Sequence, residues 1–482
     1  MTLKKPLFFV SVLVMAALVV GLATPTWANV FASNMKQTGD RSFSYILNEG
    51  AGTGVQAQVW QVGGGMVYSQ DLGAQTKGLN TWNWSGVGGV VGGNYKIKVA
   101  ATGANYSGWT KTSVNSTQNN FFLPLGVAVN KNQNSQYFGR VYVSESAGGL
   151  TTTAPTNSRT TQDGLYLLNA DFSDAVGQGN TARKGGVAWG TTNSPWRVEV
   201  GPDNNLYVAD WSDSHSGLWM GDPDFVSASE ILDSTGRAAS GLNVTHGSID
   251  GFVVEGTGAD RKIYTMDEDM GTPATQTNSI WRYDIGTSSL FTGAPSAIVY
   301  NDAANGDKIM NSLADIIHAS DGTWWATQNR SGNTNDTLGS LLQIAADGST
   351  VLWKSVTGLA ANSMVDPLKK ARGLAYDPVN NILAVTTNNV GKVQIFDPVG
   401  KTVIATITTV SNAINNDAVF DAAGNLYIVD SNNERLSVWS PSGANSFTAE
   451  SWFSFAGVPE PSSLLALLAG LPGLLMFKRR RH

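Results

Sequence analysis

The sequence predicts an all-β protein, and three observations lead to this fold class. Short runs of β-branched and aromatic residues alternate with clusters of Gly, Asn, Asp and Ser, which is typical of strands joined by tight turns. The chain of 482 residues contains 53 glycines and only 14% charged residues, a composition that suits many turns. A unit of three short strands also recurs along the chain, which favours radially packed sheets.

The clearest copy of this unit spans residues 419–439. Val419 and Phe420 end one strand, an Ala-Ala-Gly-Asn turn follows at 422–425, and residues 426–429 form the next strand. A polar turn then leads to a third strand at residues 436–439. Because a lone meander is marginally stable in water, the unit requires neighbours.

Six copies of the unit occupy residues 121–456, at about 56 residues each. This repeat predicts a six-bladed β-propeller with four-stranded blades. A cryptic seventh blade remains open, and a solenoid is the weaker alternative. The middle strands are expected at residues 140–145, 206–210, 262–267, 324–328, 382–387 and 426–430.

Fourth strands are expected at the outer edge of five of these blades. Each follows an outer strand and combines β-branched or aromatic residues with flanking polar turns. They are predicted at residues 186–189, 297–300, 350–353, 403–408 and 452–455.

Residues 205–210 (Asn-Leu-Tyr-Val-Ala-Asp) and 425–436 (Asn-Leu-Tyr-Ile-Val-Asp-Ser-Asn-Asn-Glu-Arg-Leu) carry a family resemblance. They resemble the NHL-type and related propellers, whereas copies one, three, four and five are degenerate. The resemblance implies the fold. It implies function only weakly, because that family includes binding platforms and a few enzymes.

Residues 29–111 precede the repeats and predict a small β-sandwich, with period-two strands at 43–47, 55–60, 66–68, 81–84 and 95–99. Gly-rich turns, the Trp82-Asn83-Trp84 run and Gly93-Asn94-Tyr95 resemble the immunoglobulin-like module of flagellar hook-capping proteins. Ser85 stands where that family often has an acid. We expect a spacer or docking module in which one of the two tryptophans is core and the other half-exposed, and the alternative is that they stack on sugar rings. Residues 112–120 are expected to form a linker.

The two ends of the chain predict export and sorting. Residues 1–28 combine Lys4 and Lys5, an apolar core and a small-residue site ending at Ala28, which is typical of a cleaved signal peptide. The alternative is a retained membrane anchor. Residues 457–482 combine Pro459-Glu460-Pro461, a 14-residue apolar run at 464–477 and a terminal basic cluster. This run is too short to span a ~30 Å hydrocarbon core as a helix.

These three parts of the tail, in this order, resemble the PEP-CTERM sorting signal. The resemblance implies an exosortase-type processing enzyme as a partner, transient membrane association, and a final location at the cell surface or in exopolysaccharide. An ordinary C-terminal anchor is the alternative reading.

Composition excludes several kinds of site. There is no Cys, so thiolate metal sites and Cys nucleophiles are absent. The four histidines make a multi-His metal site unexpected. Without the six basic residues and one acid of the two ends, 25 basic and 36 acidic residues remain, which argues against a nucleic-acid partner.

Two sets of charged residues are the candidate sites. Acids end four of the middle strands, where they would meet near one end of the central channel and bind a Ca²⁺-like ion. The alternative is that each acid caps its own turn. The candidate metal residues are Glu145, Asp210, Asp267 and Asp430, and a second set before the inner strands, Arg197, Asp250, Asp315, Arg372 and Asp417, is the candidate ligand-binding mouth of the channel.

Two functions remain open. The first is a non-enzymatic surface or matrix protein that binds polysaccharide or an envelope protein. The second is an extracellular propeller hydrolase or lyase with its site at the channel. Few acid–base residues and no Gly-x-Ser-x-Gly motif or phosphate loop favour the first, and no catalytic residue is assigned.

Overall fold

The computed structural model describes residues 30–85, 93–189, 193–211, 217–233, 249–267, 279–291, 295–300, 315–329, 339–359, 366–388, 391–443 and 446–454. The predicted signal peptide and sorting tail, with Pro459, Glu460 and Pro461, therefore lie outside the described residues. The described chain is almost entirely β, with one short helix, α2 (Ser355–Gly358), and three single 3₁₀ turns. None of its helices has the length and apolarity needed to cross a membrane.

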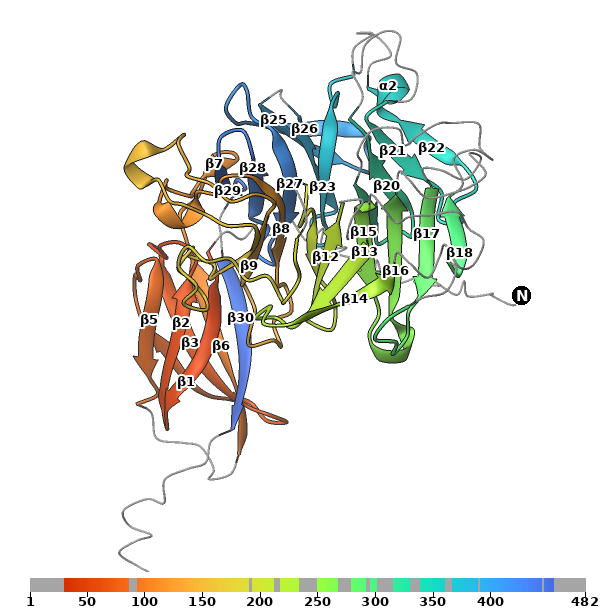
Figure 1. Cartoon of the computed structure of the whole chain (residues 1–482). Helices are drawn as coiled ribbons and strands as arrows, with labels where there is room; N and C mark the ends of the chain where they lie inside the picture. The colour runs from red at the N-terminus through yellow and green to blue at the C-terminus, as the bar shows by residue number, and fades with distance from the viewer. Residues whose placement is uncertain are drawn as a thin grey trace, which may run out of the picture.

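Most of the chain forms six antiparallel sheets, counted over the described residues, that stand around a common centre (Figure 1). The first five sheets use only successive strands, so neighbours in sequence are neighbours in the sheet, and the sixth adds one strand from an earlier part of the chain. The first is β8 (Pro124–Val129), β9 (Val141–Glu145) and β10 (Gly164–Leu168); the second is β11 (Val198–Val200), β12 (Leu206–Asp210), β13 (Gly217–Gly221) and β14 (Ala228–Asp233); the third is β15 (Ile249–Glu255), β16 (Lys262–Asp267), β17 (Ser279–Asp284) and β18 (Ala297–Tyr300).

The remaining three sheets repeat this order. They are β19 (Ile316–His318), β20 (Trp324–Thr327), β21 (Leu341–Ile344) and β22 (Val351–Lys354); β23 (Ala371–Asp377), β24 (Ile382–Thr387), β25 (Lys392–Asp397) and β26 (Thr402–Thr408); and β27 (Asn415–Phe420), β28 (Leu426–Asp430), β29 (Arg435–Ser440) and β7 (Thr110–Lys111).

The six sheets close into a ring, because each inner strand contacts the neighbouring sheet in sequence and β27 returns to β8. Apolar side chains fill the space between sheets. At the closure, Val127 and Val143 of the first sheet share a core with Tyr427, Val429 and Leu436 of the sixth. The all-β propeller fold predicted from the repeats is confirmed by this arrangement.

The second unit is a two-layer β-sandwich (Figure 1). One sheet contains β1 (Ala32–Gly39), β2 (Ser42–Leu47) and β5 (Gly78–Asn83). The other contains β30 (Ser446–Ser454), β6 (Asn94–Thr102), β3 (Gly54–Gln61) and β4 (Met66–Asp71). Alternate residues of these strands point inward and form one core, in keeping with the period of two in their sequences.

The two units exchange strands. The two-residue strand β7, from the segment after the sandwich, is the outer strand of the sixth sheet. Conversely β30, from the segment after the ring, pairs along nine residues with β6, and its blue ribbon lies among the red and orange sandwich strands in Figure 1. The prediction that residues 452–455 form a fourth propeller strand is therefore wrong.

Three of the other predicted fourth strands are confirmed as β18, β22 and β26. The prediction at residues 186–189 is wrong, because no strand forms there and the first sheet has three strands. Sequence reasoning also missed β14, the fourth strand of the second sheet. Edge strands pair on one side only, so their patterning is weak.

The predicted linker, residues 112–120, packs along the sixth sheet. The Thr112 amide donates to the Val438 carbonyl at 3.0 Å, and the Asn119 side chain donates to the Leu436 carbonyl at 3.2 Å. The tryptophan prediction is wrong. Trp82 and Trp84 are 4% and 1% exposed, so both belong to the sandwich core.

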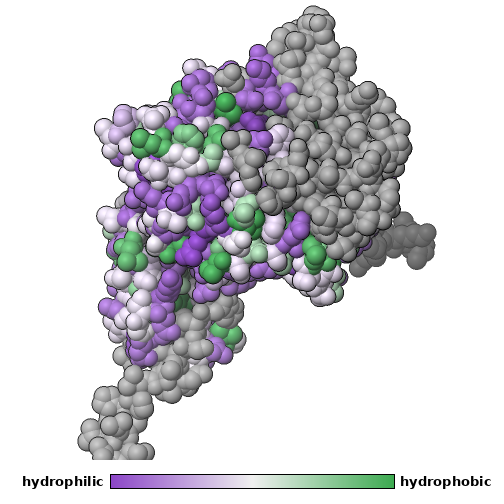
Figure 2. Space-filling view, in the orientation of Figure 1, coloured by the Kyte–Doolittle hydropathy of each residue, from purple (hydrophilic) through white to green (hydrophobic). Residues whose placement is uncertain are grey.

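The sandwich and the ring share a continuous apolar core. Phe138, in the turn between β8 and β9, lies 5.6 Å from the Phe31 ring and 6.3 Å from the Phe447 ring, measured between centroids. Ala170 and Ala423, from turns of the first and sixth sheets, join the same cluster. Elsewhere the visible surface mixes hydrophilic residues with scattered apolar ones (Figure 2).

Candidate functional site: the central channel

Four of the six inner strands begin with an irregularity in their pairing, at the position where one residue of each sheet faces the ring axis. The register shifts between Pro124 and Gly126 in β8, and a similar shift occurs in β15, β23 and β27. Such bulges re-aim side chains at the rims of sheets. In ring order, the residues at this position are Gly126, Arg197, Gly251, Asp315, Gly373 and Asp417, so glycine alternates with a charged residue.

The three glycines are required by close approach of the next sheet. A Cβ on Gly251 would lie 2.8 Å from the Asp315 Cα, and one on Gly373 would lie 2.6 Å from the Asp417 Cα. A Cβ on Gly126 would meet the Trp196 carbonyl oxygen at 2.8 Å. Glycine in one sheet therefore lets the charged residue of the next sheet reach the axis.

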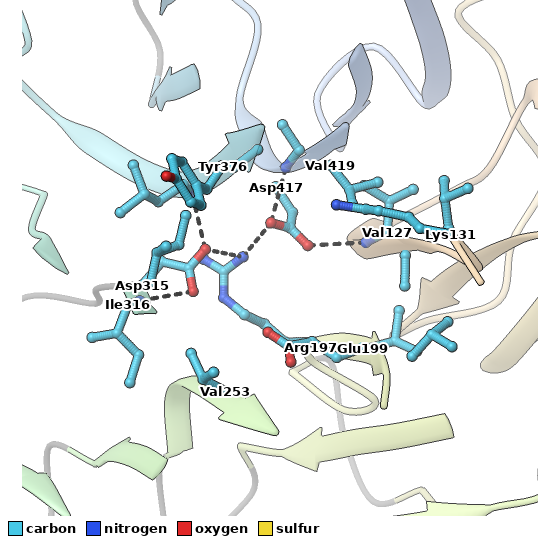
Figure 3. Close-up of a pocket in the computed structure, with 18 of the residues that line it drawn as sticks. Val127, Lys131, Arg197, Glu199, Val253, Asp315, Ile316, Tyr376, Asp417 and Val419 are labelled. Atoms are coloured by element: carbon cyan, nitrogen blue, oxygen red, sulfur yellow. Dashed lines mark hydrogen bonds and ion pairs between the residues drawn. The ribbon is translucent and has the colours of Figure 1, made fainter. Parts of the chain in front are cut away.

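The three charged side chains meet at the axis (Figure 3). The Arg197 Nη1 atom lies 2.6 Å from Asp417 Oδ1 and 3.2 Å from Asp315 Oδ2. These residues come from the second, sixth and fourth sheets, and all three are almost fully buried. One guanidinium thus joins alternate sheets across the ring.

Each aspartate also binds the backbone of the following sheet. Asp417 Oδ2 accepts a hydrogen bond of 3.0 Å from the Val127 amide, and Asp315 Oδ2 accepts one of 2.9 Å from the Leu374 amide. The other oxygens accept from the amides of Ala418 and Ile316. The cluster therefore satisfies backbone donors of inner strands, which are edge strands of their sheets.

The two remaining mouth residues contribute mainly through their backbone. The Asp250 carbonyl accepts from Arg197 Nε at 2.8 Å and from the Trp196 indole at 3.0 Å. The Arg372 carbonyl accepts from the Thr327 hydroxyl at 2.6 Å, and its guanidinium lies 5.2 Å from the Trp196 ring centroid. Burial, with repulsion from Arg197, lowers the pKa of Arg372 to about 10.

Electrostatics in the cluster reflect burial. Burial raises the pKa of Asp315 to about 7, although Arg197 acts in the opposite direction, and the pKa of Asp417 is raised for the same reason. Burial would lower the pKa of Arg197, but attraction to Asp315, Asp417 and Asp250 outweighs it and raises the pKa. Arg197 therefore stays protonated, whereas burial makes the ionised form of both carboxyl groups less favourable.

The cluster borders a channel cavity of about 230 Å³ that is lined mainly by Val, Ala and Ile side chains of the inner strands. Besides Arg197, Asp315 and Asp417, four other polar residues line it: Lys131, Glu199, His318 and Tyr376. Burial and the charges of Asp315 and Asp417 raise the pKa of Glu199 well above its usual range. The Lys131 side chain keeps accessible surface in the channel, yet enclosure by the walls lowers its pKa.

Sequence reasoning did not identify Lys131, Glu199, His318 or Tyr376 as channel residues. Glu199 is the middle residue of β11, in the pattern Val-Glu-Val. The charge of Glu199 inside an otherwise apolar inner strand could have indicated a channel residue, because inner strands border the channel.

His318 is held by two hydrogen-bond acceptors. Its Nδ1 atom lies 2.5 Å from Glu255 Oε1, and its Nε2 atom lies 3.2 Å from the Gly322 carbonyl oxygen. Its ring stacks on Trp324 at 4.2 Å between centroids. Because only the imidazolium donates from both nitrogens, Glu255 raises the pKa of His318.

The candidate metal residues remain within their own sheets. Asp430 Oδ1 accepts from the amides of Ile414, Asn432 and Asn433, as expected of a turn cap. Glu145 Oε1 accepts from the Leu123 amide at 2.6 Å, and Asp210 accepts from the Ser194 hydroxyl. The Asp267 side chain lies outside the described residues. Within the described ranges, no three His, Cys, Asp or Glu side chains are grouped to hold a metal ion.

Comparison with known proteins adds little to this geometry. No protein-family model and no curated protein matches the chain. Among solved structures, a protein of unknown function from Bacteroides thetaiotaomicron has 11% identity and a TM-score of 0.40, covering 85% of this chain and 98% of its own. The WD40 β-propeller domain of Doa1 has 10% identity and a TM-score of 0.40, covering 70% and 97%.

A calcium-binding protein, regucalcin, from Agrobacterium tumefaciens is similar to the same degree. It has 11% identity and a TM-score of 0.40, covering 70% of this chain and 95% of its own. The propeller fold of this chain rests on its own sheet pairing and ring closure.

Proposed function

We propose that this chain is an exported, non-enzymatic binding protein of the bacterial cell surface or exopolysaccharide. The observation that carries the proposal is the Arg197–Asp315–Asp417 cluster. Its charges pair with one another and with backbone amides of neighbouring sheets, so they hold the ring together. The charged residues at the channel mouth then have a structural role, and the ligand binds at other surfaces of the protein.

Export and sorting are part of the same proposal. The signal peptide at residues 1–28 and the PEP-CTERM-like tail at 457–482 would deliver the chain to the outer surface, where an exosortase-type enzyme removes the tail. The sandwich, with its likeness in sequence to an immunoglobulin-like module, and the NHL-like ring would form one rigid body. Its partner would be extracellular polysaccharide or an envelope protein.

A second candidate function, a hydrolase or lyase, is favoured by one observation. Glu199 lines the channel cavity with a raised pKa, as a general acid would. Lys131 lines the same cavity and would be its basic counterpart.

The test compares the purified protein with its Glu199→Gln variant. Sedimentation with exopolysaccharide from the producing cells measures binding, and release of reducing or unsaturated sugar measures turnover. The proposal predicts binding without turnover, and equal binding by Glu199→Gln. Turnover that disappears in Glu199→Gln at unchanged thermal stability would establish the enzyme instead.

A further inference from the structure

A second cavity, which we name the junction cleft, lies where the sandwich meets the first two sheets of the ring. It has a volume of about 460 Å³ and is lined from four separate segments. Lys36 comes from β1, Tyr137 and Arg140 from the turn before β9, Arg183 from the segment after β10, and Asp224 from the turn between β13 and β14. Clefts between structural units are common binding sites, and this volume lies in their usual range of roughly 300–1,000 Å³.

The charge of the junction cleft is opposite to that of the chain. Three basic side chains line it against one acidic side chain, although the whole sequence contains 31 basic and 37 acidic residues. Mutual repulsion makes a group of basic side chains unfavourable unless negative charge compensates it. The cleft therefore complements an anion.

Two of the three cations are available to a ligand. Over the described part of the chain, neither Lys36 nor Arg183 makes an ion pair. Lys36 is exposed and Arg183 half-buried. Screening by water is weaker for a charge that is partly enclosed, so a bound carboxylate or sulfate would interact strongly with Arg183.

The third cation is fixed in position. Arg140 forms an ion pair with Asp224, donates to the Pro223 carbonyl at 3.2 Å, and lies 4.6 Å from the Tyr137 ring centroid. A guanidinium held in this way costs little side-chain entropy when a ligand binds. Arg140 and Asp224 are therefore positioning residues for the cleft.

The other lining groups favour sugar over protein. Asn34, Gln136 and the Tyr137 phenol offer amide and hydroxyl groups that match sugar hydroxyls. Among the described residues, the apolar lining is limited to Ala175, Val176 and Val226, so the cleft offers no deep apolar pocket for an anchoring side chain of a protein partner.

We propose that the junction cleft binds an acidic segment of extracellular polysaccharide, with uronate carboxylates or sulfate esters at Lys36 and Arg183. This inference rests on the proposed binding function and gives it a location and a ligand chemistry. The contacts are ionic, so the affinity decreases with added salt.

The test uses the full chain, with polygalacturonate as the acidic probe, dextran as the neutral one and polyglutamate as an acidic peptide. The double variant Lys36→Glu with Arg183→Glu reverses the two available charges. The control Lys111→Glu with Lys392→Glu changes net charge equally at two exposed lysines that do not line the cleft and that make no ion pair in the described part of the chain. Affinity is measured by isothermal titration calorimetry, and folding by thermal unfolding.

The expected result is saturable binding of polygalacturonate that weakens with salt, falls at least tenfold in the cleft variant, and persists in the control at equal thermal stability. Equal loss in both variants would overturn the cleft as the site. If the protein binds only dextran, or only polyglutamate, the ligand is not an acidic polysaccharide. That result would overturn the proposed ligand class and leave the proposed binding function standing. Binding of no probe, while cell exopolysaccharide is bound, would do the same.

Discussion

The Arg197 guanidinium lies 2.6 Å from an Asp417 carboxylate oxygen, and this contact joins the second sheet of the ring to the sixth. With Asp315 from the fourth sheet, three alternate sheets meet at one buried point. Because a propeller has no covalent closure, contacts across its axis and at its seam determine whether the ring stays shut.

The first prediction concerns Arg197. Arg197→Met leaves two buried aspartates without their cation, and removing one partner of a buried ion pair typically costs about 3–5 kcal/mol. Urea unfolding monitored by tryptophan fluorescence measures the loss. Lys184→Met breaks a half-exposed pair with Asp163 at 2.7 Å and is expected to cost about 1 kcal/mol or less.

The alternation of glycine and charge leads to a second prediction. In Gly373→Ala the new Cβ lies 2.6 Å from the Asp417 Cα, a backbone atom that moves only with its strand. Overpacking of this kind costs about 1–3 kcal/mol. Gly52→Ala is the control, since its Cβ has nothing within 4 Å. Equal melting temperatures for the two variants would contradict the account.

The exchanged strand β30 gives a third prediction. Ala449 is fully buried in the sandwich and faces Val99 of β6. Ala449→Asp buries a carboxylate there and is expected to cost several kcal/mol, on the order of 3. Hydrogen exchange should show faster exchange in β6 but not in β24 of the ring. Thr448→Asp, at the neighbouring exposed position, should leave both protected.

A fourth prediction concerns pH. Glu255 raises the pKa of His318, so the stabilisation from this pair is complete below the unfolded pKa of about 6.5 and is lost as pH rises through the folded value. NMR titration of His318 should give a pKa above 6.5, and Glu255→Gln should lower it. A His318 pKa at or below 6.5 in the unaltered protein would rule out the imidazolium.

Local patterning made much of the fold predictable. Inner, middle and outer strands carry the period and turn residues of their own sheet, as in residues 419–439, so each could be assigned independently. The strand that pairs with β30 could not be predicted. Its nine residues pair with β6, more than 340 positions earlier, and an alternating sequence fits a propeller edge equally well.

The candidate site was predictable only in position. Alignment of the repeats placed Arg197, Asp315 and Asp417 at equivalent points near the channel, and the structure brings all three together. That they pair with each other depends on the glycines between them, whose role only the packed ring shows. Asp430 illustrates the reverse case, because the amides of Asn432 and Asn433 in its own turn donate to its carboxylate.

The most direct test of the central claim, that the channel-mouth charges are architecture, combines two measurements on Arg197→Met. One is its free energy of unfolding, and the other is its affinity for cell exopolysaccharide under conditions where it remains folded. The account predicts a loss of about 3–5 kcal/mol in stability with unchanged affinity. Unchanged stability with lost binding or lost turnover would contradict it.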